Sequence, residues 1–250
     1  MTEGYKKIDI HGHLGEWYSP GNGGSVAAMR AALAKWGIER CVLSSGRGLL
    51  VDMVAGNREV EAVVEAHDEF RGYVYVDPTH VDESVAEIER YAKHPRFVGI
   101  KSRPEYHNAE KFDSPAYRAI LAAAAAHRLP ALIHFWDPTP PRAHVAMAEE
   151  FKIPVILAHA GGNLWRQCID CVAGQPNIYL DFCSSIADAG KIEYGVSKCG
   201  ADHVVFGTDL MLIHPAWTMG MYLDAEITDA DRRLIFRENA LRLFRFDERT

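Results

Sequence analysis

The sequence is poor in cysteine and has no long apolar run. Five of its 250 residues are cysteines, and they are scattered along the chain. An odd, scattered set predicts reduced thiols and excludes a small fold stapled by disulfides. The longest apolar runs, such as residues 119–126, fall well short of the roughly 18–20 residues that a membrane-spanning helix needs. We therefore expect no membrane partner.

Positive charge is also scarce. Lysine and arginine together number 27 against 34 acidic residues, which gives a formal net charge of -7. Nucleic-acid binding needs a basic stripe, and the chain has none, so we exclude nucleic acid as a partner. No apolar stretch follows Lys6 and Lys7 near the start, so we expect no secretory signal and a cytoplasmic protein.

Short apolar runs alternate with helical stretches along the chain. The expected strands are residues 7–11, 40–44, 72–76, 97–101, 131–135, 155–158, 178–182 and 203–207. The expected helices are residues 25–36, 50–69, 84–93, 114–128, 140–151, 163–173, 191–198 and 229–244. Strands that are apolar on both faces are typical of a buried parallel sheet.

This alternation predicts an α/β fold with one domain over residues 1–250. Eight βα units in a chain of this length favour a closed (β/α)8 barrel, the TIM-barrel architecture. A doubly wound open sheet is the alternative, but no Gly-x-Gly-x-x-Gly fingerprint follows the first strand. Ser25 is expected to begin the first helix and Gly37 to end it.

Twelve histidines are an unusual number, and several of them end predicted strands. His11 and His13 are two positions apart, so their side chains share one face of an extended strand. His134, His159 and Asp209 end three further strands, where a barrel of this kind builds its active site. Three histidines and one aspartate suit one divalent metal ion; zinc is favoured, and manganese, iron and cobalt are the alternatives. Such an ion lowers the pKa of a bound water toward ~7.

These motifs resemble the amidohydrolase superfamily of metal-dependent barrels. The nearer match is its branch of aminocarboxymuconate-semialdehyde decarboxylase-like and "amidohydrolase 2" proteins. The resemblance covers nearly the whole chain, and its order of motifs is specific to the superfamily rather than to one reaction. The matching segments are Ile8–His13, Ala158–Gly162, Phe206–Asp209 and Arg237–Phe244.

The resemblance implies a role for each of these strand-end residues. His11, His13 and His134 correspond to metal ligands. Asp209 corresponds to a ligand or to the base that takes a proton from the metal-bound water. His159 corresponds to the acid/base group that polarises the substrate. Acid/base groups of this kind serve hydrolysis.

Four further residues end or follow predicted strands and are candidates for substrate binding. Lys101 could bridge two ions, as a lysine does in two-metal relatives, but we favour a single ion and a role for Lys101 in binding a substrate carboxylate. Arg47 and Arg103 could clamp a carboxylate in bidentate fashion. Trp136 could wall an apolar pocket.

Three interpretations of function remain open. The favoured one is a metal-dependent hydrolase in which activated water attacks a C–N, lactone or ester-type carbonyl of a small organic substrate that carries a carboxylate. The alternative is a non-oxidative decarboxylase of an aromatic or unsaturated carboxylic acid, which should hold the carboxylate with a cation near the metal. The third is a barrel that binds metal or ligand without turnover. A homodimer is also compatible with this fold class.

Overall fold

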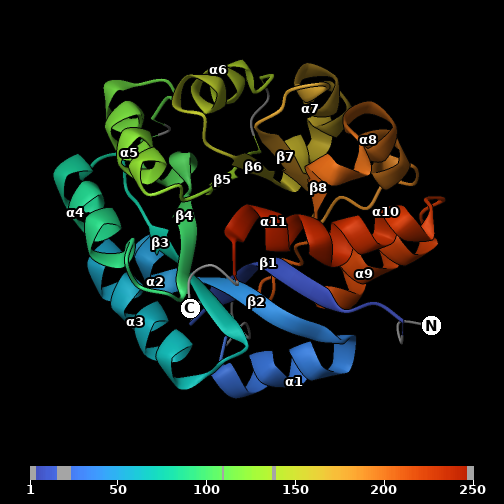
Figure 1. Ribbon diagram of the computed structural model, residues 1–250, viewed down its shortest axis with the longest axis horizontal. Helices are drawn as coiled ribbons and strands as arrows, with labels where there is room; N and C mark the ends of the chain where they lie inside the picture. The colour runs from blue at the N-terminus through green and yellow to red at the C-terminus, as the bar shows by residue number, and fades with distance from the viewer. Residues whose placement is uncertain (1–3, 16–23, 109, 137–138, 247–250) are drawn as a thin grey trace.

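The computed structural model describes residues 4–15, 24–108, 110–136 and 139–246. Eight parallel strands form one sheet in the order β1 to β8. The strands are β1 (Lys7–Leu14), β2 (Ile38–Ser45), β3 (Phe70–Tyr75), β4 (Phe97–Ser102), β5 (Ala131–His134), β6 (Val155–Ala158), β7 (Ile178–Asp181) and β8 (Val204–Val205). The sheet closes because Ile10 N donates to Phe206 O at 3.0 Å. The predicted single-domain (β/α)8 barrel is therefore confirmed (Figure 1).

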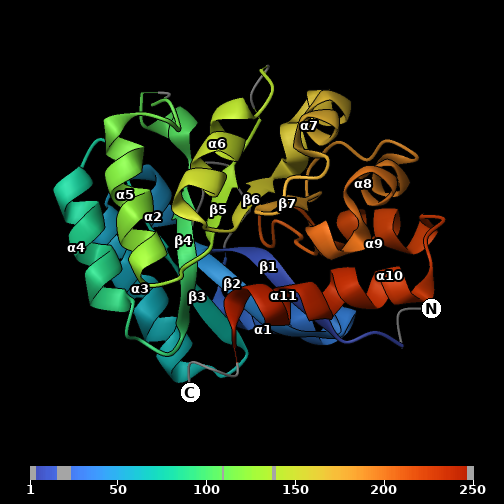
Figure 2. The same ribbon diagram turned by 45° about the horizontal axis from the view of Figure 1, so that its top comes forward.

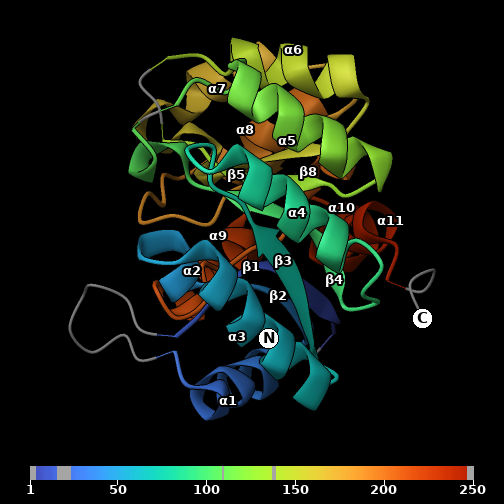
Figure 3. The ribbon, with the colours of Figure 1, turned by 90° about the vertical axis from the view of Figure 1, so that its left-hand side faces the viewer.

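Helices surround the barrel, as Figures 1 and 2 show. The α-helices are α1 (Val26–Trp36), α2 (Gly46–Leu50), α3 (Met53–Ala66), α4 (Val81–Tyr91), α5 (Pro115–Ala126), α6 (Arg142–Phe151), α7 (Trp165–Val172), α8 (Lys191–Cys199), α9 (Pro215–Asp224), α10 (Asp229–Arg233) and α11 (Asn239–Phe244). Figure 3 shows α3, α4 and α5 along the side of the barrel formed by β3 and β4. Within the described residues, no helix combines the length and apolar character needed to cross a membrane.

Local sequence signals explain several helix ends. The Ser25 side chain accepts a hydrogen bond from Ala28 N, and Gly37 ends α1 with a left-handed φ of 64°; both assignments were predicted. The helix expected over residues 50–69 begins only at Met53, as α3, because Asp52 adopts an extended conformation and caps its start, whereas Leu50 ends the separate helix α2. Helix α9, which follows β8 and begins at Pro215, was not predicted.

The core has an outer and an inner part. The outer cluster lies between the strands and the helices. The inner cluster fills the barrel and includes Ile8 and Ile10 near the start of β1, together with Phe244 and Phe246 from the end of the chain. Figures 1 and 2 accordingly show α11 beside β1. The starts of the strands are thus filled by apolar side chains, which leaves their carboxyl ends for polar groups.

Candidate metal centre

Two of the predicted ligands lie at the carboxyl end of β1. The pairing of β1 with β2 shifts between Asp9 and Gly12, so the strand leaves its regular alternation where the histidines begin. A Cβ on Gly12 would lie 2.6 Å from Cys41 Sγ, so glycine is needed for this close approach to β2. The His11 and His13 rings are buried, with centroids 5.1 Å apart.

Asp209 completes a group of three possible ligands with His11 and His13. Its Oδ1 atom lies 2.9 Å from His13 Nε2 and 3.5 Å from His11 Nε2. This oxygen is buried and accepts no hydrogen bond from the described part of the chain. Two imidazole nitrogens around a buried carboxylate oxygen fit a divalent cation, which would lie between these three ligand atoms.

Further contacts fix how these histidines are oriented. The carboxylate of Asp181 can only accept, so His11 Nδ1, 2.7 Å from Asp181 Oδ2, carries the proton and His11 Nε2 keeps its lone pair. His13 Nδ1 lies 3.1 Å from Ser44 Oγ. A carboxylate behind a ligating histidine orients the ring and raises its basicity. Sequence reasoning missed Asp181, although its place at the end of β7 was the available signal.

Asp9 joins β1 to the segment that carries Asp209. Its carboxylate accepts the backbone N–H groups of His11 and Thr208, both at 3.0 Å, and the Thr208 hydroxyl at 2.5 Å. Burial raises the pKa of Asp9 to about 7. This network fixes the spacing between His11 and Asp209, and it was not predicted from the sequence.

His159 and His134 form a hydrogen-bonded pair beside this group. The Cys183 carbonyl can only accept, so His159 Nδ1, at 2.5 Å, donates to it. Burial lowers the pKa of His159 to about 4, so the ring is neutral and its Nε2 accepts from His134 Nδ1 at 3.0 Å. His134 Nε2 therefore keeps a lone pair, as a metal ligand requires, and lies 3.8 Å from Glu105 Oε1.

The structure thus brings His11, His13 and Asp209 into one group of ligand atoms. His134 lies outside this group and forms a hydrogen bond with His159. The assignment of His134 as a metal ligand and of His159 as an acid/base group stays a prediction.

Two residues of the centre have unusual backbone conformations. His159 has a φ of 68° and Asp209 a φ of 58°, both in the left-handed region. Non-glycine residues adopt this region at a cost, and such strain clusters at functional sites. His159 directly follows β6, and Asp209 lies in the segment that follows β8.

Lys101 lies inside the centre. Its side chain is 1% exposed, and Nζ lies 3.1 Å from His11 Nε2. Burial lowers the pKa of Lys101 to about 8, against the opposing effect of the Asp209 charge, so the amine is protonated at neutral pH. A buried ammonium group is expensive unless an anion is near it.

The other predicted substrate residues divide into two groups. The Arg103 guanidinium lies 3.7 Å from the centroid of the Tyr106 ring, and its charge adds to burial in lowering the pKa of His11. The Trp136 ring lies 5.6 Å from that of His159. Arg47, by contrast, pairs with Glu59 at 3.3 Å and is half-exposed; no contact within the described residues joins it to the centre.

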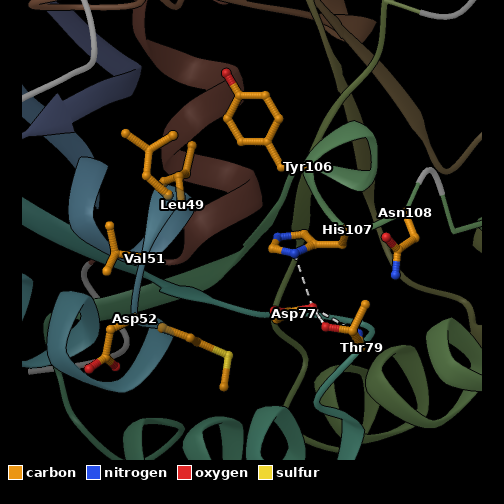
Figure 4. Close-up of a pocket in the computed structure, with 11 residues that line it drawn as sticks. Leu49, Val51, Asp52, Asp77, Thr79, Tyr106, His107 and Asn108 are labelled. Carbon is orange, nitrogen blue, oxygen red and sulfur yellow. Dashed lines mark hydrogen bonds and ion pairs between the residues drawn. The ribbon is translucent and has the colours of Figure 1, made fainter.

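A separate cavity of about 490 Å³ lies between the start of α3 and the segments that follow β3 and β4 (Figure 4). Figure 4 shows His107 pointing to Asp77, which lies 3.1 Å away. His107 Nε2 meets Tyr75 Oη at 2.7 Å, and the Thr79 hydroxyl donates to Asp77. The polar groups of this cavity therefore bind one another, and no predicted site residue lines it.

Comparison with known proteins also indicates an amidohydrolase barrel. A family model described as amidohydrolase matches residues 8–246. No protein of curated function matches the sequence. A 2,6-dihydroxybenzoate decarboxylase from Rhizobium superposes with a TM-score of 0.81 at 15% identity, over 97% of this chain and 99% of that one.

Two further solved structures are similar in the same way. The 5-carboxyvanillate decarboxylase LigW from Sphingomonas paucimobilis has a TM-score of 0.76 at 17% identity, over 96% of this chain and 99% of its own. A dihydroxybenzoic acid decarboxylase from a Polaromonas species, with bound manganese and the inhibitor 2-nitroresorcinol, has a TM-score of 0.74 at 18% identity, over 97% and 98%. At these identities the likeness shows the fold alone.

Proposed function

The chain belongs to the amidohydrolase family, and from that premise we propose that it is a metal-dependent decarboxylase of a small carboxylic acid. The three similar structures named above are decarboxylases of substituted benzoic acids, which supports this choice. The sequence favoured hydrolysis and kept decarboxylation as the alternative. The surroundings of Lys101 now give the alternative the better support.

The ion would be held by His11 Nε2, His13 Nε2 and the Asp209 carboxylate, with His134 as the proposed fourth ligand. Zinc suits this set, and manganese is the metal bound in one similar structure. When bound, a divalent ion supplies Lewis acidity toward a substrate oxygen. Asp181 and Ser44 orient the two histidines of β1.

Lys101 is the observation that carries the proposal. Its ammonium group is buried beside His11, and no carboxylate of the described residues lies within ion-pair distance of it. Arg103 adds a second positive charge nearby, as its effect on the pKa of His11 shows. A buried ammonium group beside a metal-ligand group favours a negatively charged substrate, and a carboxylate is such a group.

Residues of the protein would then have to deliver one proton to the substrate. Decarboxylation breaks the bond between the carboxylate and its carbon, and that carbon takes up a proton as carbon dioxide leaves. Asp209 is the proposed carrier of this proton, which it would take up from solvent and pass to the carbon, because it lies between the two histidines of β1. His159, neutral because burial lowers its pKa to about 4, is proposed to act through His134, from whose Nδ1 it accepts a hydrogen bond.

Hydrolysis is the second candidate, and the arrangement of Asp209 beside His13 favours it. A carboxylate 2.9 Å from an imidazole can equally take a proton from an attacking water. The products separate the two reactions, since only decarboxylation releases carbon dioxide.

The test measures carbon dioxide release by metal-loaded protein from a panel of hydroxylated benzoic acids. We expect Lys101→Met to lower kcat/KM by about 100-fold or more while metal content is kept. Lys191→Met is the matched control, because Lys191 is also a buried lysine, 1% exposed, but contacts Ser184 and the Ile186 carbonyl instead. Unchanged turnover in Lys101→Met, or acid formation from lactones without carbon dioxide, would overturn the proposal.

A further inference from the structure

The lone pair of His11 Nε2 has two possible partners. His11 Nδ1 donates to Asp181 Oδ2 at 2.7 Å, so the neutral ring carries no hydrogen on Nε2, and this atom can only accept. Lys101 Nζ lies 3.1 Å from Nε2 and donates to it. The same Nε2 atom is the one that His11 would offer to a metal ion. It can bind the ammonium group or the ion, but not both at once.

Lys101 reaches His11 from across the barrel. It lies in β4, where it pairs with Tyr75 of β3 and Leu132 of β5, and strands β2 and β3 separate it from β1. Its side chain is 1% exposed, so it crosses the interior of the barrel instead of extending into solvent. The fold therefore holds this cation against a candidate metal ligand.

We propose that Lys101 competes with the metal ion for His11, and that a substrate carboxylate relieves this competition by drawing the ammonium group to itself. The inference rests on the proposed function, in which Lys101 binds that carboxylate, and it adds a means of regulating the same site. Lys101 must leave His11 Nε2 before an ion can bind there, and its positive charge then repels the ion. The metal affinity is therefore lower than the ligand group alone would give.

The ion and the carboxylate should consequently strengthen each other's binding. A carboxylate beside Lys101 is a stronger acceptor than a neutral imidazole, because opposite charges add to the hydrogen bond. It therefore holds the ammonium group away from His11 and leaves Nε2 to the ion. By linkage, each ligand raises the affinity for the other by the same factor. Decarboxylation removes the charge that holds Lys101, so this coupling ends with each turnover.

Arg103 offers a matched comparison, because it places a second positive charge near the same histidine. Its charge helps to lower the pKa of His11, but its guanidinium group lies against the Tyr106 ring, 3.7 Å from the centroid. If Lys101 acted only through its charge, removal of Arg103 would change the metal affinity in the same way. A specific effect of Lys101 indicates competition for the Nε2 lone pair.

The first measurement is the zinc affinity of the full chain, by competition with a chelator of known affinity in a buffer without carboxylates. We expect Lys101→Met to bind zinc about tenfold more tightly than the unaltered protein, because one charge-assisted hydrogen bond no longer has to be broken. Arg103→Met should gain clearly less. Unchanged or weaker zinc binding in Lys101→Met, or an equal gain in Arg103→Met, would overturn the inference. Lys101→Ala gives the same comparison if the methionine variant is unstable.

The second measurement repeats these titrations with saturating benzoate as the carboxylate probe. Benzoate should raise the zinc affinity of the unaltered protein by a larger factor than that of Lys101→Met, whose remaining gain comes from direct attraction between ion and carboxylate. Equal factors in the two proteins would overturn the coupling.

Neither measurement needs turnover, so the two proposals can fail separately. Tighter zinc binding by Lys101→Met together with unchanged carbon dioxide release would refute the proposed function alone. Unchanged zinc affinity in Lys101→Met together with lost carbon dioxide release would refute the competition for His11 alone.

Discussion

Each histidine of the β1 pair has one nitrogen bound by the protein and the other turned toward Asp209. Asp181 holds Nδ1 of His11, and Ser44 meets Nδ1 of His13. The two rings are thus oriented before any ion binds, which reduces the entropy lost on binding. The Nε2 atoms, which face Asp209, are the ones that a metal would use.

Asp181→Asn tests this orientation. The amide can still accept through its oxygen but no longer carries the charge that raises the basicity of His11, so we expect metal affinity to fall by about 10–100-fold. Competition with a chelator of known affinity measures it. Asp188→Asn is the control, because Asp188 binds Trp165 Nε1 instead of a ligand. An unchanged affinity in Asp181→Asn would show that the contact does not tune the site.

Asp9→Ala tests the network that joins β1 to the end of β8. Without the carboxylate, the buried backbone N–H groups of His11 and Thr208 lose their acceptor. We expect the free energy of unfolding to fall by about 2–4 kcal/mol. Urea denaturation measures it, and Asp52→Ala serves for comparison: it removes only a helix cap, which costs about 1 kcal/mol. Equal losses in the two variants would contradict this view of Asp9.

Among the elements, the short turn η2 (His159–Leu164) departs most from a regular helix. Ala160, Gly161 and Gly162 all have positive φ. A Cβ on Gly162 would lie 2.3 Å from the Trp136 ring. The turn therefore packs its backbone against a tryptophan beside the metal centre, and the side chain of His159 depends on that packing.

Gly162→Ala should be more damaging than the same change at a glycine with open space. At Gly162 the strain of a positive φ adds to a clash with Trp136, so we expect a loss of about 2–4 kcal/mol in the free energy of unfolding. Gly174→Ala is the matched control: its φ is 74°, but nothing lies within 4 Å of the added Cβ, so the cost should be about 1 kcal/mol. Thermal denaturation measures the loss of stability in each variant. Similar losses in the two would show that a clash with Trp136 does not contribute.

Elements with a clear period and a capping residue were predictable from the sequence. The strands and α1 are examples, since apolar runs and the pair Ser25 and Gly37 mark them. The break before α3 and the turn η2 were not, because each depends on one residue's backbone conformation. The contacts of Asp181 and Glu105 could not be predicted either, since they join residues that are distant in sequence.

For the whole molecule, Lys191 is a source of pH-dependent stability. Burial lowers its pKa from 10.5 to about 8. Between these values the unfolded chain binds more protons than the folded one, so this lysine makes stability rise with pH from about 8 to 10.5. The full effect is about 3 kcal/mol at most. Urea denaturation at several pH values in this range gives the free energy of unfolding of the native protein and of Lys191→Met. We expect the two plots of this free energy against pH to have different slopes. Equal slopes would refute the role of Lys191.

Metal removal should lower the stability of the whole barrel. The proposed ligands come from β1, β5 and the segment that follows β8, so an ion stabilises only the closed form. At a concentration of 100 times its Kd, it should add about 2.7 kcal/mol. Thermal denaturation with and without chelator measures this shift, and His13→Ala should show none. A shift of equal size in His13→Ala would place the ion elsewhere.

The closure of the barrel between Ile10 and Phe206 also sets when the site can exist during synthesis. Asp9 and Thr208 are 199 positions apart, and Asp209 follows them. A nascent chain that leaves the ribosome carries His11 and His13 long before their carboxylate partner is made. The ion can therefore be held by this group only after nearly all of the barrel has been translated. We therefore expect each chain to bind its metal late in synthesis, after β8 has closed against β1.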